Sequence, residues 1–307
     1  MSASDVGRFT VRAPANSGNV GAGFDVLAIT LDLWNEATFE FGGEGIEVVL
    51  QGEFTEHIPT DESNLIVHTM LRRLRELRVP APKGMRVTCL NNVPPNSGLG
   101  SSSVVLTMGV LAADVVAGRR TDPVELLQRV GAMEGHIENA AAAALGGLVL
   151  VSGSDNDLHY RSFRVPEMLA VLVTPPPHYS TRQARALLPQ AVPLSDAIFN
   201  MGRVPLIVEA LKSGDLELLS RVVDDRLHQR YRLALTPGAE EALQAAWEAG
   251  AAGAFVSGSG PTLLAFARDL DEAQRVGEAM LEEFHVFEVD AHIKVVTTSN
   301  EAAGLVE

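Results

Sequence analysis

The sequence of 307 residues has little lysine and a single cysteine. Its three lysines are outnumbered by 21 arginines, and none lies beside a glycine-rich segment. The Gly-Lys-Ser/Thr signature of P-loop nucleotide-binding proteins is therefore absent. Cys89 has no second cysteine to pair with, so a disulfide-stabilised secreted scaffold is excluded. Residues 1–10 lack the apolar core of a secretory signal, and we expect a cytoplasmic protein.

Long apolar segments are also missing. The two longest, residues 140–151 and 104–113, are too short to span a bilayer and predict buried core elements. The net charge of −15 disfavours nucleic acid and anionic membranes as partners, because both require a basic surface. The eight histidines show no zinc-type spacing, and no Gly-x-Ser-x-Gly sequence indicates a serine hydrolase.

Strand and helix patterns alternate along the chain, which predicts an α/β fold. A strand at 9–13 is expected to end at Pro14, and strands 36–41 and 46–50 flank a glycine turn, as in a hairpin. The polar segment 152–164 is the predicted linker between two halves. Further strands are expected at 85–90, 146–151, 169–173, 254–256, 263–267 and 292–297, and helices at 61–78, 104–117, 122–133, 181–188, 204–212, 216–228, 239–249 and 270–283.

Two glycine-rich segments are candidates for binding phosphate. The glycine loop (residues 95–103) leads directly into the buried helix predicted at 104–117, for which a serine is the expected N-cap. Backbone N–H groups in such a loop and the positive end of the helix attract anions. The glycine turn (residues 257–262) lies between two strands and could close over the same phosphate. The structural alternatives are an ordinary capped loop and an ordinary tight turn.

Polar residues elsewhere suggest a site for a small zwitterion and a metal. In the irregular loop 14–25, Asn19 and Asp25 could bind an ammonium group, although Asx turns explain them equally well. Glu134 falls near a helix C-terminus, where the dipole disfavours a carboxylate, so it is a candidate Mg²⁺ ligand or else a solvated surface residue. Arg185, one helical turn after Thr181, could grip a carboxylate.

Together these segments resemble the GHMP kinases, and among them the homoserine kinases. Gly98-Leu99-Gly100-Ser101-Ser102-Ser103 is similar to the phosphate loop of the family, and Ser257-Gly258-Ser259-Gly260-Pro261-Thr262 to its third motif. Residues 14–25 resemble the first motif in its homoserine-kinase form, and 180–189 and 228–238 also resemble homoserine kinases. The resemblance covers nearly the whole chain.

The resemblance implies a two-domain α/β fold that binds ATP between its halves. Residues 1–158 would resemble ribosomal protein S5 domain 2, and residues 159–307 a ferredoxin-like sandwich. It implies ATP-dependent phosphorylation of the homoserine hydroxyl in threonine biosynthesis, with Mg²⁺ and no obligatory general base, and, by analogy with family members, a homodimer.

The resemblance also assigns residues to roles. The nucleotide would contact Asn64, Pro95, Asn96, Ser97, Gly98, Leu99, Gly100, Ser101, Ser102, Gly258, Ser259 and Gly260. Ser102 and Glu134 would hold Mg²⁺. Homoserine would lie among Asn19, Asp25, Glu138, Asn139, Arg185 and Arg232, with Thr181, Arg185 and Glu134 as the catalytic residues.

The departures from the family pattern lie near the acceptor. His136-Ile137-Glu138-Asn139 replaces the usual His-Pro-Asp-Asn, and Gly18 and Asn16 stand where alanine and threonine are usual. The alternatives are therefore a GHMP kinase for another small alcohol, such as threonine, a sugar or a mevalonate-like compound, or a non-catalytic nucleotide-binding module.

Overall fold

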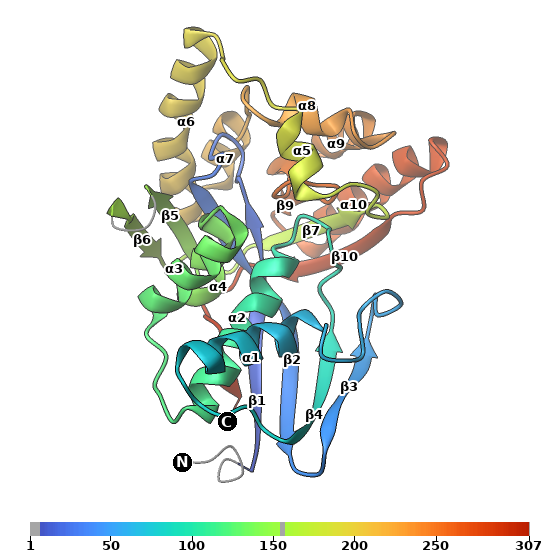
Figure 1. The fold of residues 1–307 in the computed structure, drawn as a ribbon. Helices are drawn as coiled ribbons and strands as arrows, with labels where there is room; N and C mark the ends of the chain where they lie inside the picture. Colours follow the sequence, from blue (N-terminus) through green and yellow to red (C-terminus); the bar gives the residue numbers. More distant parts are fainter. Residues whose placement is uncertain (1–6, 154–156, 307) are drawn as a thin grey trace.

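The computed structural model describes residues 7–153 and 157–306, which form a mixed α/β molecule built on two sheets (Figure 1). The first sheet has the order β11-β1-β2-β4-β3, with β5 pairing with β2 and β6 with β5. It comprises β1 (Arg8–Gly18), β2 (Leu27–Phe41), β3 (Gly45–Gly52), β4 (Gly84–Asn91), β5 (Leu148–Ser152), β6 (His159–Phe163) and β11 (Gly304–Val306). The second, with the order β10-β7-β9-β8, comprises β7 (Leu169–Thr174), β8 (Gly253–Val256), β9 (Leu263–Ala267) and β10 (His292–Thr297).

Helices cover both sheets. The helices are α1 (Leu65–Glu76), α2 (Ser101–Val116), α3 (Pro123–Glu134), α4 (Glu138–Leu145), α5 (Thr181–Ala186), α6 (Leu194–Ser213), α7 (Leu216–Val222), α8 (Gln229–Leu233), α9 (Ala239–Glu248) and α10 (Leu270–Val286). Helices α2 and α4 pack on the first sheet, α1 packs on α2, and α3 packs on α2 and α4, while α9 and α10 pack on the second sheet (Figure 1). As its apolar sequence predicts, α2 is buried on most faces. Its one buried acid, Asp114, accepts a hydrogen bond of 3.1 Å from Arg73.

The first strand continues past Pro14, contrary to the prediction that it ends there. The pairing of β1 with β2 shifts register between Pro14 and Asn16, which marks a bulge. Proline lacks an N–H donor, so a bulge is one of the few positions where a sheet accommodates it. The continuation carries β1 to Gly18, beside the glycine turn.

The hairpin predicted around Gly42–Gly45 is wrong, because β4 lies between β2 and β3. It pairs antiparallel with β2 and parallel with β3, and α1 makes the crossover from β3 to β4. The glycine segment passes around the start of β4 instead of forming a two-strand turn. Gly42 and Gly45 donate N–H bonds of 3.1 and 3.0 Å to the carbonyls of Gly84 and Lys83.

Three other expectations differ from the structure. The predicted linker 152–164 contains β6, which pairs with β5; its residues 154–156 lie outside the described residues. Helix α6 begins ten residues before the predicted 204 and contains Pro205 in its interior, although proline is usual at the first helical position. The helix predicted at 216–228 is interrupted where Asp225 Oδ2 accepts the N–H groups of residues 227–229 and caps α8.

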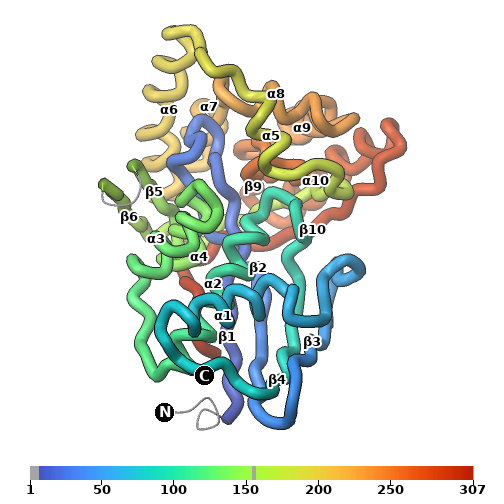
Figure 2. Tube along the Cα trace, viewed as in Figure 1, coloured from blue at the N-terminus to red at the C-terminus, as the bar shows by residue number. Residues whose placement is uncertain are grey.

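The two halves of the chain are interleaved in space. The chain leaves the first sheet after β6 and returns to it at β11, which pairs with β1. The loop after β1 reaches towards α7 and α8 (Figure 2). Division at residues 158 and 159 stays a prediction. Among the described residues, no helix is both long and apolar enough to cross a membrane.

Candidate active site

The glycine loop follows β4 and takes an unusual backbone path into α2. Asn96, Gly98 and Gly100 have positive φ angles of 56°, 85° and 68°. No described side chain caps this end of α2, and Ser101 is already helical, so the predicted serine N-cap is wrong. The uncapped N–H groups and the positive dipole end of a 16-residue helix suit a phosphate group.

The glycine turn packs directly against the glycine loop. A Cβ on Gly98 would lie 2.3 Å from the Ser257 carbonyl oxygen, and one on Gly258 would lie 2.6 Å from the Gly98 carbonyl oxygen. The Ser257 hydroxyl donates to the Gly98 carbonyl at 2.8 Å, and the Gly258 N–H donates to the Gly18 carbonyl at 2.9 Å. The end of β1, the glycine loop and the glycine turn therefore meet, although they lie far apart in sequence. The close approaches at Gly98 and Gly258 leave no room for a side chain.

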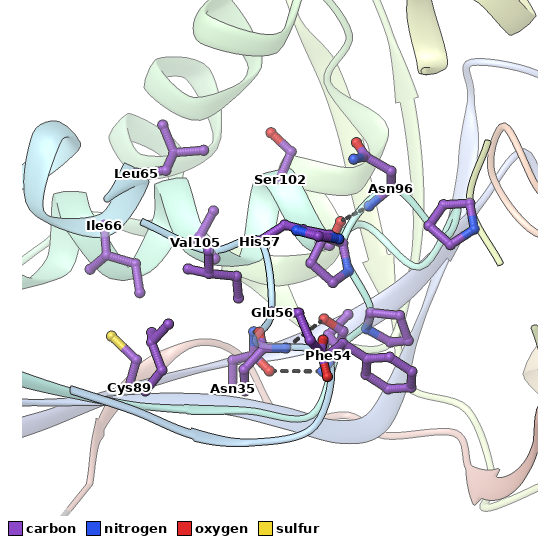
Figure 3. Close-up of a pocket in the computed structure, with 18 of the residues that line it drawn as sticks. Asn35, Phe54, Glu56, His57, Leu65, Ile66, Cys89, Asn96, Ser102 and Val105 are labelled. Carbon is purple, nitrogen blue, oxygen red and sulfur yellow. Dashed lines mark hydrogen bonds between the residues drawn. The ribbon is translucent and has the colours of Figure 1, made fainter. Parts of the chain in front are cut away.

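A large cavity of about 620 Å³ opens on one side of the glycine loop. In Figure 3, Asn96 and Ser102 lie towards one end of this cavity, and Leu65, Ile66 and Cys89 towards the other. Its size and its many apolar side chains are typical of a site for an aromatic ligand such as a nucleoside base. Further lining residues are Phe54, Ile58, Pro59, Pro95, Val105 and Met108.

Asn64 lines the large cavity, as the resemblance implies, but its amide is already engaged. Its Oδ1 caps α1 by accepting the Ile66 N–H at 3.1 Å, and its Nδ2 donates to the Pro59 carbonyl at 3.0 Å. Asn64 therefore shapes the cavity wall, and its side chain holds the 59–66 segment in place.

A polar pocket of about 60 Å³ lies on the other side of the glycine loop. Asn96, Ser101 and Ser102 line both cavities, so the loop and the start of α2 join them. The small volume suits a small polar ligand. The other residues that line the polar pocket are Asn19, Asp25, Gly98, Gly100, Glu134, His136, Glu138, Asn139, Thr181, Arg185, Arg232, Gly258 and Ser259.

Glu134, the last residue of α3, offers a carboxylate beside the start of α2. Ser103 donates a hydrogen bond to its Oε2. Burial raises the pKa of Glu134, although the charge of His136 and the hydroxyls of Ser103 and Ser102 lower it. No group of three or more His, Cys, Asp or Glu side chains among the described residues could hold a metal by itself. Glu134 and the serine hydroxyls fit Mg²⁺ that arrives with a phosphate ligand, since Mg²⁺ is commonly held by one or two carboxylates and substrate phosphates.

Arg185 and Asp25 form a two-pronged ion pair at the rim of the polar pocket. Arg185 NH1 and NH2 donate to Asp25 Oδ2 and Oδ1 at 2.8 and 2.7 Å. The hydrogen bond to Asp25 raises the pKa of Arg185, so this group stays charged. Asp25 is held in the left-handed region at φ 58°, where its N–H donates to Asn19 Oδ1 at 2.8 Å. The carboxylate of a zwitterionic ligand could therefore pair with Arg185, and its ammonium group with Asp25.

Arg232, in α8, is the second guanidinium group and is almost fully buried. Its NH1 donates to the Gly258 carbonyl at 2.6 Å and lies 3.1 Å from His228 Nδ1. Its Nε has no hydrogen-bond partner among the described residues. Burial lowers the pKa of Arg232 to about 10, which leaves it charged at neutral pH.

Two buried acceptors in the pocket are unsatisfied. Glu138 Oε2 and Asn139 Oδ1 lack hydrogen-bond partners among the described residues. The other Glu138 oxygen lies 3.3 Å from His136 Nδ1. Burial lowers the pKa of His136, but the nearby carboxylates of Glu138 and Glu134 raise it above its usual value. Buried acceptors without partners are costly, so these oxygens suit a donor group such as an ammonium.

Most residues that the resemblance assigns come together around the two cavities. Thr181 Oγ1 lies 3.1 Å from Ser259 Oγ at the polar pocket. The Asn19 amide is used internally, because its Nδ2 donates to the Gly258 carbonyl at 2.9 Å. Three assigned residues are not among the described residues lining either cavity: Ser97, Leu99 and Gly260. The Leu99 side chain belongs to the core between the sheets.

The sequence reasoning missed several residues at the site. His136 receives no role from the sequence, yet it lines the polar pocket beside Glu138. Ser103 reaches Glu134, although the family motif drew attention to Ser102. Phe24 contacts both arginines, and His228 contacts Arg232. The signal that could have indicated these residues is their position, because each lies within four residues of an assigned residue.

Comparison with known proteins identifies relatives along the whole chain. The family model described as the N-terminal domain of GHMP kinases matches residues 64–147, and the C-terminal model matches residues 207–286. Homoserine kinase of Desulfitobacterium hafniense is 35% identical over 297 residues, which cover 96% of this chain and 99% of that protein. Homoserine kinase of Moorella thermoacetica is 36% identical over 294 residues, which cover 95% and 98%.

Solved structures of kinases also resemble this chain over nearly its full length. Homoserine kinase from Cytophaga hutchinsonii aligns with a TM-score of 0.84 and 29% identity over 97% of both chains. L. major mevalonate kinase, solved with R-mevalonate, aligns with a TM-score of 0.73 over 96% of this chain and 97% of its own. At 18% identity, the second comparison supports the fold alone.

Proposed function

The chain belongs to the GHMP kinases, and from this premise we propose that it transfers the γ-phosphoryl group of ATP to the side-chain hydroxyl of homoserine. The product is O-phosphohomoserine, an intermediate of threonine biosynthesis. The family and the mixed α/β fold predicted from the motifs are thereby confirmed.

One observation carries the proposal: a single glycine loop separates a large, mainly apolar cavity from a small pocket with paired charges. A nucleoside fits the first and a short zwitterion the second, so the γ-phosphate would lie between them at the start of α2. We propose that the N–H groups of residues 96–102 bind the phosphates of ATP. Glu134 and Ser102 would hold Mg²⁺, which neutralises phosphate charge.

The chain's own residues position the acceptor. Arg185 and Arg232 bind its carboxylate, while Asp25, Glu138 and Asn139 accept hydrogen bonds from its ammonium. Thr181 orients the hydroxyl beside the glycine turn. Phosphoryl transfer has a loose transition state, so positioning and charge neutralisation supply most of the acceleration. Both Asp25 oxygens bind Arg185, so Asp25 serves in substrate binding and is not the general base in this proposal.

We also propose a cytoplasmic location and a homodimer. Cys89 is buried, and burial raises the pKa of its thiol to about 12, which fits an inert cysteine. Leu194, Ile198 and Met201 are 74%, 56% and 63% exposed and follow one side of α6 at helical spacing. Light scattering after size exclusion should give twice the chain mass, and Ile198→Glu should give the monomer; a monomeric wild type would refute the dimer.

The first experiment measures ADP release by the purified protein with Mg²⁺-ATP. Homoserine, threonine, serine, mevalonate and galactose are compared as acceptors, and EDTA provides the metal-free control. We expect turnover with homoserine alone and none with EDTA. Turnover with another alcohol would retain the ATP site and overturn the acceptor assignment. ATP binding without turnover on any acceptor would favour a nucleotide-binding module.

A further inference from the structure

Phe24 lies among the side chains of Arg185, Arg232 and His228, of which the two arginines line the polar pocket. Its ring centroid is 5.4 Å from Arg185 Cζ and 5.2 Å from Arg232 Cζ. The His228 ring stacks on it at 5.3 Å with an interplanar angle of 29°. Cations within about 6 Å of an aromatic ring are attracted to its face. One half-buried ring therefore contacts both guanidinium groups.

Two neighbouring guanidinium groups require such support because their charges repel. Burial is the main cause of the lowered pKa of Arg232, and the charge of Arg185 acts in the same direction. Asp25 compensates both arginines in the free protein, but a bound ammonium would compete for its oxygens. The contacts of the Phe24 ring with both arginines do not involve the Asp25 oxygens.

His228 fixes the buried arginine from the other side. Its Nδ1 lies 3.1 Å from Arg232 NH1, which can only donate, so Nδ1 is the acceptor. Nε2 then carries the proton and donates to the Gly21 carbonyl at 3.0 Å. This imidazole is fully buried, and burial lowers its pKa to about 4, which keeps it neutral.

The loop that carries Phe24 is held by contacts at Gly21 and Ala22. Gly21 has φ 51°, and a Cβ there would lie 2.1 Å from the Val223 carbonyl oxygen. Asn200 Nδ2, from α6, donates to the neighbouring Ala22 carbonyl at 3.1 Å. The loop after β1 is thus seated against α6 and the segment before α8, and its aromatic ring has a defined place.

We propose that Phe24 and His228 are positioning residues that preassemble Arg185 and Arg232 into a clamp for the acceptor carboxylate. This inference rests on the proposed function, in which the two arginines bind that carboxylate. It adds two residues that need not touch the substrate and act through the arginines.

The test compares Phe24→Leu with wild type on homoserine and on 3-amino-1-propanol, which lacks the carboxylate. We expect KM for homoserine to rise about tenfold, since two cation–π contacts are lost, while kcat and KM for ATP stay within about twofold. The efficiency with 3-amino-1-propanol should be unchanged. Phe24→Tyr, which keeps the ring, should restore most of the homoserine affinity.

Phe199→Leu is the matched control. Phe199 is also half-buried and lies 3.2 and 3.8 Å from the Cζ atoms of Arg203 and Arg226. Neither arginine is among the described residues lining the polar pocket. The kinetics of Phe199→Leu should match those of wild type.

His228→Leu should reproduce the rise in KM for homoserine that is expected of Phe24→Leu. His228→Asn, which retains an acceptor near Arg232, should show a smaller rise.

Three results would overturn the inference: an unchanged KM in Phe24→Leu, an equal loss on both acceptors, or a matching loss in Phe199→Leu. An equal loss would indicate general disruption of the fold. If wild type shows no turnover on homoserine, the proposed function fails and the clamp fails with it. Homoserine turnover with an insensitive Phe24→Leu refutes the clamp alone.

Discussion

Glu134 places a carboxylate where folding disfavours its charge. It ends α3, so the negative end of the helix dipole adds to the effect of burial. Burial raises the pKa of Glu134 above the ordinary 4.5. A raised carboxyl pKa means that its contribution to stability is present below pH 4.5 and is lost as pH rises through the folded-state pKa. A cation bound with the nucleotide would relieve this cost.

Glu134→Gln should therefore separate stability from activity. At pH 7 the ligand-free variant should melt at a higher temperature than wild type, and the difference should shrink below pH 4.5. The kcat should fall on the order of 100-fold, as expected when one charged group at a phosphoryl site is lost. Calorimetry across pH and steady-state kinetics test both expectations. A variant that is less stable at pH 7 would contradict the account of burial.

Asp25→Asn should impair binding more than chemistry. The change removes the charge that pairs with Arg185 and the proposed partner of the ammonium group. KM for homoserine should rise at least tenfold, with kcat reduced less than tenfold. Initial-rate kinetics over homoserine concentration provide the measurement. A normal KM with a collapsed kcat would instead indicate a general base.

Gly18 leaves room for the Asn139 amide. A Cβ on Gly18 would lie 2.5 Å from Asn139 Oδ1, which is an unpartnered acceptor among the described residues. Gly18→Ala should push this oxygen away and raise KM for homoserine about tenfold, with KM for ATP unchanged.

Gly202→Ala is the control for this substitution. No described atom lies within 4 Å of a Cβ at Gly202, and the residue is within α6, where alanine is favoured by about 1 kcal/mol. Its kinetics should match wild type, and its melting temperature should rise slightly. Equal effects of both substitutions on homoserine KM would refute the role assigned to Gly18.

At the scale of elements, the site depends on two glycine-rich segments in backbone contact. Gly98 has φ 85°, and its Cα faces the Ser257 carbonyl. The contact brings the start of α2 against the turn between β8 and β9. Both of these strands belong to the second sheet, whereas β4, which precedes the glycine loop, belongs to the first. Any side chain at Gly98 must separate these elements.

Gly98→Ala should lower the free energy of unfolding by more than the roughly 1–2 kcal/mol cost of a left-handed alanine, and it should raise KM for ATP. Gly135→Ala measures the free-energy cost of a left-handed alanine without a clash, because Gly135 has φ 79° but no described atom within 4 Å of a Cβ. Urea denaturation of the two variants, with ATP kinetics, provides the comparison. Equal destabilisation would show that the clash is unimportant.

At the scale of the whole molecule, the polar pocket draws on most of the chain. Its residues come from the loop after β1, the starts of α2, α4 and α5, the end of α3, α8 and the glycine turn. The strongly negative net charge makes this local arrangement necessary, since the overall field repels ATP. A ligand in the site should therefore stabilise both sheets together.

Thermal melting with a non-hydrolysable ATP analogue and Mg²⁺ tests this coupling. At 100 times Kd, the free energy of unfolding should increase by about 2.7 kcal/mol, which corresponds to a rise of roughly 5 °C or more. One transition should move as a unit. Two transitions, of which only one shifts, would indicate that the halves unfold independently.

The local parts of this protein can be read from its amino-acid sequence alone. The glycine loop, the buried helix after it and the glycine turn each follow from residues close together in the chain. Left-handed backbone and helical periodicity depend on near neighbours, so they leave a readable pattern. The ordered motifs then identified the family.

The contacts between distant segments become visible only in the folded molecule. The insertion of β4 between β2 and β3, the return of β11 to β1 and the seating of Phe24 between two arginines are all long-range contacts. Many pairings satisfy the same alternation of apolar residues, and packing of the whole chain selects one of them. For the same reason, the sequence showed that Arg185 and Asp25 were candidates, and only the fold brought them into one ion pair.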